Sequence, residues 1–178
     1  MSTSAAGSPL FTIEVPAAED AEALALVHVR TWREAYTGLM PEEFWSPAAL
    51  KRRIAMWTAI LTEWDDTEIR SRLRIARDAA TGEPVGFALA GRAREAEGVS
   101  AAPRAEELHA LNVLASFYGT GVAQALVGEL LGERPAFLWV ADPNPRAQRF
   151  YEKIGFAPDG TVKHDAALDG LREIRMVR

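Results

Sequence analysis

The sequence predicts a single α/β domain in which helices flank a mixed β-sheet. With 178 residues, the chain is long enough to bury a hydrophobic core without disulfides or a structural metal. Segments typical of strands and of helices follow one another without a repeat or a low-complexity linker between them. Residues 1–9 are expected to form a flexible tail, which leaves residues 10–178 as the domain.

One strand and two helical regions are expected in the first third of the chain. Residues 10–15, LFTIEV, alternate as a half-buried strand does. Apolar residues then recur at helical spacing over residues 16–38, which end at a glycine. A second helical region is expected over residues 41–64, with a break near Ser46 and Pro47.

Three strands follow in the middle of the chain. Residues 68–78 and 83–93 are expected to pair as a hairpin around the turn at residues 80–82, Ala-Thr-Gly. Residues 106–114, EELHALNVL, are expected to form the next strand.

The remaining elements alternate between helix and strand. A helix is expected over residues 119–131 and another over residues 144–155. Between them, the apolar run at residues 136–141 reads as a central strand covered on both faces. The rest of the chain, including residues 171–177, is expected to form one or two antiparallel strands.

Composition and charge exclude several classes of function. A formal net charge of −5 argues against nucleic-acid binding, which requires a basic surface. The chain has no cysteine, and its histidines, His28, His109 and His164, lack the spacing of metal ligands, so no metal is expected. The N-terminus lacks the pattern of a signal peptide and no apolar run could span a bilayer. We therefore expect a cytoplasmic protein without a membrane partner.

The segment from Gly119 to Gly121 indicates a phosphate-binding turn. Free backbone N–H groups and the positive end of a helix dipole favour an anion where glycines precede a helix. A dinucleotide-binding motif fits weakly, because Gln124 occupies the third glycine position although Asp142 follows at a suitable distance. A P-loop also fits weakly, because no Gly-Lys-Ser or Gly-Lys-Thr follows the turn.

A resemblance to a known family lies in two segments, LNVLASFYGTGVAQAL (residues 111–126) and NPRAQRFYEKIGF (residues 144–156). Together they resemble the GNAT superfamily of acetyl-CoA-dependent N-acetyltransferases, whose turn reads Gln/Arg-x-x-Gly-x-Gly/Ala and whose second segment reads Asn-x-x-Ala-x-x-Phe-Tyr-x-x-x-Gly-Phe. The second segment is filled at every position, whereas the first turn position carries Tyr118 in place of Gln or Arg.

The resemblance implies a GNAT-like, mostly antiparallel central sheet and an acyltransferase that uses acetyl-CoA as co-substrate. The expected reaction is direct transfer of the acetyl group to a primary amine of a small molecule or a peptide. The alternative is a non-catalytic coenzyme-binding or regulatory module with the same fold. The resemblance is also compatible with a homodimer.

The resemblance further assigns roles in catalysis. Tyr151 is expected beside the coenzyme sulfur, where its phenol would protonate the departing thiolate. Glu107 is expected to act as the base through water, with His109 as the rival because an imidazole accepts a proton near neutral pH. If the strand is regular, Glu107 and His109 share one face with Leu111 and Val113. Backbone groups at residues 113–114 are expected to stabilise the oxyanion.

The remaining site residues are expected to hold the two substrates. Acceptor binding is assigned to Tyr36, Leu39 and Met40, which lie between the first two helical regions. Coenzyme binding is assigned to residues of the strand, the turn and the second segment: Leu111, Asn112, Val113, Leu114, Tyr118, Gly119, Thr120, Gly121, Val122, Ala123, Asn144 and Tyr151.

Overall fold

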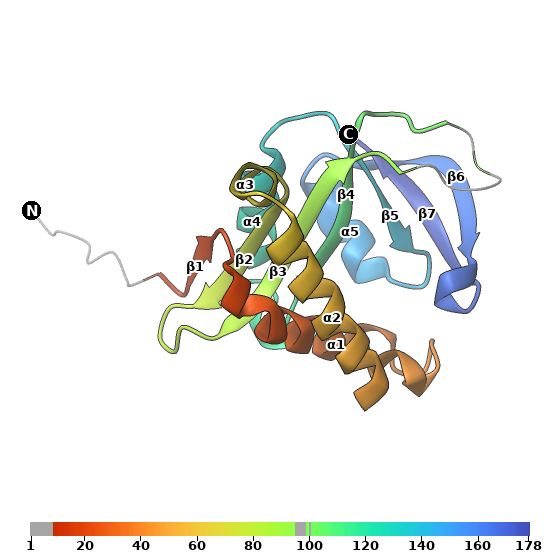
Figure 1. Ribbon diagram of the computed structural model, residues 1–178. Helices are drawn as coiled ribbons and strands as arrows, with labels where there is room; N and C mark the ends of the chain where they lie inside the picture. The colour runs from red at the N-terminus through yellow and green to blue at the C-terminus, as the bar shows by residue number, and fades with distance from the viewer. Residues whose placement is uncertain (1–8, 95–98, 100) are drawn as a thin grey trace, which may run out of the picture.

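The computed structural model describes residues 9–94, 99 and 101–178, and it contains a seven-stranded sheet (Figure 1). Of the expected N-terminal tail, residues 1–8 lie outside the described residues. The strands run in the order β1-β2-β3-β4-β5-β7-β6 across the sheet. Their bounds are β1 (Phe11–Glu14), β2 (Leu73–Asp78), β3 (Pro84–Arg92), β4 (Glu106–Val113), β5 (Phe137–Ala141), β6 (Ala157–Asp165) and β7 (Leu171–Val177).

Neighbouring strands are antiparallel except for β4 and β5, which are parallel. This arrangement confirms the expected α/β class with a mixed, mostly antiparallel sheet. The helices are α1 (Ala21–Tyr36), α2 (Pro47–Glu63), α3 (Asp66–Arg72), α4 (Val122–Leu131) and α5 (Pro145–Lys153). Within the described part of the chain, no helix combines the length and the apolar character needed to cross a membrane.

The helices form two layers on opposite faces of the sheet. Successive residues of β3 show this division, because Phe87 packs with one apolar cluster and Ala88 with the other. The Phe87 cluster lies beneath α1 and α2, which cross one face together in Figure 1, and includes Leu24 and Trp57. The opposite cluster joins α4 and α5 to the sheet and includes Leu126. We refer to these as the α1/α2 cluster and the α4/α5 cluster.

The second expected helical region divides into a short turn and helix α2. The expected break is confirmed, because a 3-10 turn, η2 (Glu42–Trp45), precedes α2 and the Ser46 hydroxyl caps α2 by accepting from Ala49 N–H at 3.2 Å. Pro47 occupies the first helical position, where its missing N–H has no helical partner to lose.

The strand expected over residues 68–78 begins later than its sequence pattern indicates. Residues 66–72 form helix α3, and only residues 73–78 form β2. The reason is local capping: Asp65 Oδ1 accepts a hydrogen bond from Glu68 N–H at 2.8 Å. An ion pair between Arg72 and Glu68, one helical turn apart, adds to this at 3.4 Å.

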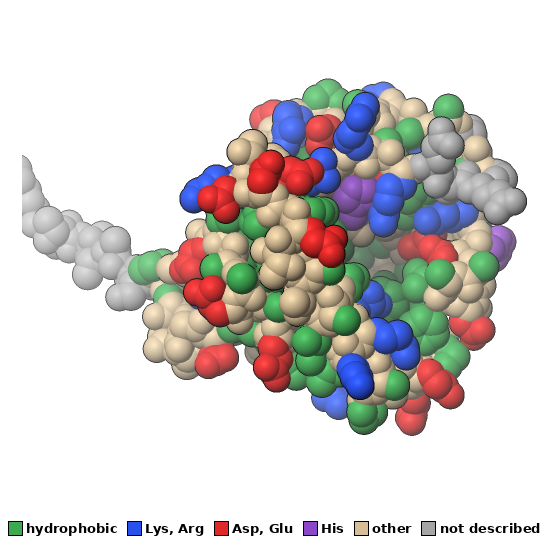
Figure 2. Space-filling view, viewed as in Figure 1, with side chains coloured by type: hydrophobic (Ala, Val, Ile, Leu, Met, Phe, Trp, Pro, Cys, Tyr) green, Lys and Arg blue, Asp and Glu red, His purple; other side chains and the backbone are tan. Residues whose placement is uncertain are grey.

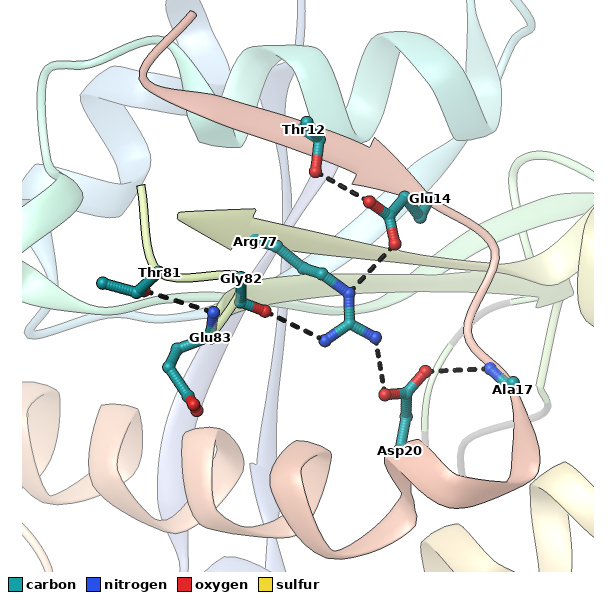
Figure 3. A network of polar contacts seen from close by, with 8 residues as sticks. All are labelled: Thr12, Glu14, Ala17, Asp20, Arg77, Thr81, Gly82 and Glu83. Atoms are coloured by element: carbon teal, nitrogen blue, oxygen red, sulfur yellow. Dashed lines mark hydrogen bonds and ion pairs between the residues drawn. The ribbon is translucent and has the colours of Figure 1, made fainter. Parts of the chain in front are cut away.

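A polar network around Arg77 connects the first strand, the hairpin and the start of α1 (Figure 3). The Arg77 guanidinium donates to Glu14 of β1 at 3.0 Å, to Asp20 before α1 at 2.5 Å and to the Gly82 carbonyl at 3.3 Å. Asp20 also accepts from Ala17 N–H at 2.9 Å, which fixes the entry to α1. The network therefore sets where α1 begins relative to β2.

We predict that Arg77→Met lowers the free energy of unfolding by about 1–3 kcal/mol, because it leaves the mostly buried Asp20 carboxylate without its cation. Urea denaturation monitored by circular dichroism measures the change. The matched control is Arg149→Met in the exposed part of α5, which removes the same charge. Equal stability of the two variants would contradict the role assigned to the network.

Candidate functional site

A cavity opens where β4 and β5 separate. Among the described residues, these strands pair only at Glu107–Phe137 and Leu108–Leu138, so the rest of β4 has no strand partner on that side. The cavity has a volume of about 680 Å3 and is lined from both helical layers, from β4 to β7 and from the turn before α4. Figure 2 shows the molecule hollowed beside the helices, with acidic, basic and histidine side chains around the hollow. We call it the β4–β5 cavity.

β4 contains a bulge in the part that borders this cavity. Leu89 of β3 pairs with Ala110, whereas the next residue of β3, Ala90, pairs with Leu108. His109 is therefore the extra residue in β4, and the strand changes its alternation at this point.

The bulge corrects the expectation that four residues of β4 share a face. Leu108 and Leu111, three residues apart, both pack in the α4/α5 cluster, so Glu107, the neighbour of Leu108, lies on the opposite face of the strand from Leu111 and Val113. Glu107 and His109 remain neighbours, with His109 Nδ1 at 3.5 Å from Glu107 Oε1. The expected set is thus divided, because it assumed a regular strand.

The backbone of β4 directs alternate N–H groups into the gap. Leu114 N–H donates to the Val85 carbonyl of the neighbouring segment at 2.9 Å, so this amide is already occupied. Because the hydrogen-bonding direction alternates along an antiparallel strand, the N–H groups of Val113 and Leu111 point away from β3. These amides are available to a ligand in the β4–β5 cavity, whereas that of Leu114 is not.

α1 anchors the end of β4 beside the cavity. Thr31 Oγ1 lies 2.9 Å from Asn112 Oδ1, and Glu34 Oε2 accepts from Ala115 N–H at 2.8 Å. The side chain of Asn112 therefore faces α1, which leaves the backbone of residue 112 and its neighbours to border the gap.

The turn before α4 has the geometry of an anion-binding site. Gly119 and Gly121 have φ angles of +78° and +92°, values that favour glycine, so α4 begins at Val122 and not at residue 119. No side chain caps α4 at Gly121. The first N–H groups of the helix are thus free of intrahelical partners, and a Cβ added at Gly119 or Gly121 would meet no atom within 4 Å.

Tyr118 stands at the entrance to this turn. The residue is 37% exposed, and the Arg146 guanidinium lies 3.7 Å from the centre of its ring. Arg146 belongs to α5, so this cation–π contact joins the two segments that carry the family resemblance. A positive charge therefore lies at the turn although its first position carries tyrosine.

Tyr151 lies on α5 at the inner wall of the cavity. Its side chain is buried between Phe150 and Phe156, with ring centres 5.3 Å and 6.0 Å away. Burial raises the pKa of the Tyr151 phenol above its ordinary value, and the neighbouring Tyr36 phenol acts in the same direction. The phenol is therefore protonated at neutral pH and can donate its proton.

Asn144 caps the helix that carries Tyr151. Its Oδ1 accepts from Ala147 N–H at 3.1 Å, and its side chain also acts on the nearby Tyr36 phenol, whose pKa it lowers. Burial raises the pKa of Tyr36, and the negative charge of Glu173 adds to this. Tyr36, Asn144 and Tyr151 thus all line the cavity, from the ends of α1 and α5.

Glu107 lies at the start of β4, whereas the glycine turn follows the end of this strand, and two residues contact its carboxylate. Its carboxylate is 3% exposed and accepts from Arg94 N–H at 2.8 Å and from the Arg94 guanidinium at 3.1 Å. Burial acts to raise the pKa of Glu107, but the contact with His109 and the hydrogen bonds from Arg94 outweigh it and hold the pKa at about 2. The carboxylate is therefore ionised at neutral pH.

A second buried carboxylate, Glu173 of β7, faces the same cavity. Lys163 Nζ lies 3.0 Å from Glu173, 3.6 Å from Asp165 and 4.7 Å from the Trp139 ring centre. Burial raises the pKa of Glu173 although the Lys163 charge opposes the shift. One ammonium group is thus shared by two carboxylates.

The cavity lining differs in part from the expected site. Of the expected acceptor residues, Leu39 is 50% exposed and Met40 is buried, and neither lines the cavity. Of the expected coenzyme residues, Leu114, Thr120 and Val122 do not line it. Sequence reasoning missed several lining residues on α2 and the last strands, chiefly Arg53, Trp57, Lys163 and Glu173. For Arg53 and Trp57, the signal in the sequence is their four-residue spacing, which places both on one face of α2. That this face meets α1 and the cavity is visible only in the fold. No three His, Asp or Glu side chains in the described ranges form a group that could hold a metal ion.

We predict that Glu107 makes stability depend on acidic pH. Its pKa is about 2 in the folded protein against an ordinary value of 4.5, so its ionised form stabilises the fold above pH 4.5 by on the order of 3 kcal/mol. This stabilisation decreases as the pH falls from about 4.5 towards 2. In Glu107→Gln, urea denaturation between pH 7 and pH 3 should lack this component, while the exposed control Glu129→Gln should follow the wild type. The same pH dependence in Glu107→Gln and wild type would contradict the prediction.

Comparison with known proteins identifies the family. A model described as the acetyltransferase (GNAT) family matches residues 28–156. Uncharacterized N-acetyltransferases of Mycobacterium bovis and Mycobacterium tuberculosis are 32% identical over 149 residues, which cover 80% of this chain and 86% of theirs.

Solved structures share the fold. The PaiA N-acetyltransferase of Thermoplasma acidophilum, in complex with coenzyme A, matches with a TM-score of 0.62 and 19% identity over 93% of this chain and 97% of that one. An N-acetyltransferase of Staphylococcus aureus matches with a TM-score of 0.60 and 14% identity over 94% and 100%. With the family model spanning most of the chain and the relatives 32% identical, the chain belongs to the GNAT family of acetyltransferases and is an acyltransferase.

Proposed function

We propose that the protein transfers the acetyl group of acetyl-CoA to a primary amine of a small molecule or a peptide. One observation carries this proposal: the β4–β5 cavity joins the unpaired edge of β4, the uncapped turn before α4 and the protonated phenol of Tyr151. These are the groups that a phosphate-bearing thioester requires, in a site that belongs to one cavity.

The turn and β4 would hold the coenzyme. The free N–H groups at Gly119, Gly121 and Ala123 suit the diphosphate, and Arg146 adds positive charge through its contact with Tyr118. Leu111 and Val113 offer backbone N–H groups that can pair with the pantetheine amides as an added strand would. The contact of Arg146 supports coenzyme binding despite the tyrosine at the first turn position.

Acetyl transfer requires a neutral amine, a stabilised oxyanion and a proton for the departing sulfur. The amine nitrogen attacks the thioester carbonyl and forms the new C–N bond, and the C–S bond then breaks. Tyr151 would give its phenolic proton to the thiolate as that bond breaks. The Val113 N–H, which points into the gap, is the candidate oxyanion donor.

The proton lost by the amine needs an acceptor. Glu107 was the expected base, but a carboxylate with a pKa of about 2 has little affinity for a proton at neutral pH. Its contact with His109 Nδ1 at 3.5 Å supports a different assignment of roles. In this assignment, His109 accepts the proton, and Glu107 orients the imidazole and balances its charge. Glu107 is thus proposed as a positioning residue.

We predict that Tyr151→Phe lowers kcat for amine-stimulated thiol release from acetyl-CoA at least about 100-fold, because the sulfur loses its proton donor. The phenylalanine preserves the packing against Phe150 and Phe156, so the fold should be retained. A panel of primary amines and a thiol-reactive dye measure the rate. The thermal shift caused by acetyl-CoA measures coenzyme binding and should be unchanged.

The non-catalytic alternative gives a different result in the same experiment. If acetyl-CoA stabilises the protein but no amine in the panel stimulates thiol release, a coenzyme-binding module replaces the proposed enzyme. If the amine stimulates release equally in wild type and Tyr151→Phe, the enzyme stands and the role of Tyr151 is refuted.

A further inference from the structure

The carboxylates that line the β4–β5 cavity differ in how far the protein already engages them. Among the described residues they are Glu107, Asp165 and Glu173. One oxygen of Glu107 accepts from the Arg94 N–H and the other from the Arg94 guanidinium. Asp165 Oδ1 accepts from Ala167 N–H at 2.9 Å, and its Oδ2 lies 3.6 Å from Lys163 Nζ. Both oxygens of these two carboxylates are therefore contacted from within the chain.

Glu173 keeps one oxygen open to the cavity. Lys163 Nζ contacts Oε2 at 3.0 Å, and no donor of the described residues forms a hydrogen bond with Oε1. The Glu173 side chain is 11% exposed. Neither of its oxygens is among the described polar atoms that lack both a partner and accessible surface. A molecule in the cavity can therefore reach Oε1.

The negative charge of Glu173 is only partly balanced. Its cation, Lys163, is also 3.6 Å from Asp165 and lies over the Trp139 ring at 4.7 Å. Burial raises the pKa of Glu173 although Lys163 opposes the shift, so a further cation beside the carboxylate would be favourable. Lys163 would keep Asp165 and the Trp139 ring as partners if Glu173 bound such a cation.

Strand pairing places Glu173 beside the start of α5. Ile174 packs in the α4/α5 cluster, so the side chain of Glu173 points to the other face of the sheet, on which α1 and α2 lie. Glu173 pairs with Ala141 of β5, and the Ala141 carbonyl accepts from Asn144 N–H at 3.1 Å. Asn144 caps the helix that carries Tyr151, which connects Glu173 to the part of the cavity where acetyl transfer is proposed.

The hydroxyl of Tyr36 lies near this carboxylate. Tyr36 ends α1, lines the cavity and is half-buried. Burial raises the pKa of its phenol and the charge of Glu173 adds to this, while the Tyr36 phenol acts in the same way on Tyr151. In the part of the chain that the structure describes, the Tyr36 hydroxyl is not among the sealed polar atoms. Tyr36 therefore interacts with both Glu173 and Tyr151 and offers an oxygen to the cavity.

An aliphatic amine needs such partners when it enters a cavity. Its pKa in water is about 10.4, so at neutral pH it arrives as an ammonium ion. Removing an ammonium from water is unfavourable unless a carboxylate and hydrogen-bond acceptors replace its hydration. Glu173 Oε1 supplies the charge, and the Tyr36 hydroxyl oxygen supplies an acceptor. The turn before α4 does not suit a cation, because helix N–H groups and Arg146 make it positive.

We propose that the acceptor enters as an ammonium ion and binds between the Glu173 carboxylate and the Tyr36 hydroxyl, so that the protein selects basic amines over weakly basic ones. This inference rests on the proposed function, because it describes how the acceptor of that reaction is received. Binding of the ammonium precedes the loss of its proton and is a separate step from acetyl transfer.

Two amines of similar size and different basicity test the proposal. Ethylamine is an ammonium ion at pH 7.5, whereas 2,2,2-trifluoroethylamine is neutral because its fluorines withdraw electrons. Each variant is compared with the wild type on the same amine, so the difference in nucleophilicity cancels. Glu173→Gln should lower kcat/KM for ethylamine about tenfold or more, the scale of one charged hydrogen-bonded contact. For trifluoroethylamine the change should be less than about twofold.

Glu129→Gln is the matched control, because Glu129 is exposed and outside the cavity lining. It removes the same charge and should leave kcat/KM unchanged for both amines. The thermal shift caused by acetyl-CoA should persist in Glu173→Gln, which shows that the variant is folded. An equal loss for the two amines in Glu173→Gln, or an equal loss in the two variants, would overturn the proposal while leaving the acetyltransferase function intact.

A binding measurement separates this inference from the proposed function. Carbon-13 NMR of the glutamate side-chain carboxyl groups, assigned on the wild type, needs neither turnover nor a variant that folds. Without acetyl-CoA, ethylammonium chloride should shift the Glu173 signal more than sodium chloride at equal ionic strength does, and trifluoroethylamine should not shift it. An unchanged Glu173 signal, or a shift confined to Glu107, would contradict the ammonium site even if amines are acetylated. A shift at Glu173 without any acetylation would support the site and count against the proposed function alone.

Discussion

The short parallel pairing of β4 with β5 is the constraint on which the site depends. Hydrogen bonding at Glu107 and Leu108 holds the strands together at one end, and beyond it β4 keeps one edge without a strand partner. A buried strand edge needs partners for its amides, and an extended ligand with amide groups can supply them. The same separation gives Tyr151 and the turn before α4 access to a single cavity.

The two ends of this cavity differ in their electrostatics. At the turn, positive potential comes from uncapped helix N–H groups and from Arg146 over Tyr118. At the other end, each buried carboxylate contacts a cation: Glu107 contacts Arg94, and Glu173 contacts Lys163, which Asp165 also contacts. Arg53 has no such match in the described residues, which distinguishes the α1/α2 wall from the rest.

Sequence patterns predicted most elements, because alternation and helical spacing are local properties, and the two segments that resemble the GNAT family predicted the family. They did not predict α3, whose formation follows from the Asp65 cap, nor the bulge at His109, which inserts one residue without a distinct signature. The wall of Arg53 and Trp57 was missed for a different reason. Four-residue spacing shows that side chains share a helix face, but only tertiary packing shows that this face meets α1 and an open cavity.

The central claim is that the unpaired edge of β4 and the turn before α4 receive the coenzyme. Amide hydrogen exchange measured by NMR, with and without acetyl-CoA, tests it at single residues. Exchange at Leu111, Val113, Gly121 and Ala123 should slow when acetyl-CoA is bound, while exchange at Leu114, whose N–H already pairs with Val85, should change little. Unchanged exchange at the first four residues under saturating acetyl-CoA, or slowing confined to another part of the chain, would contradict it.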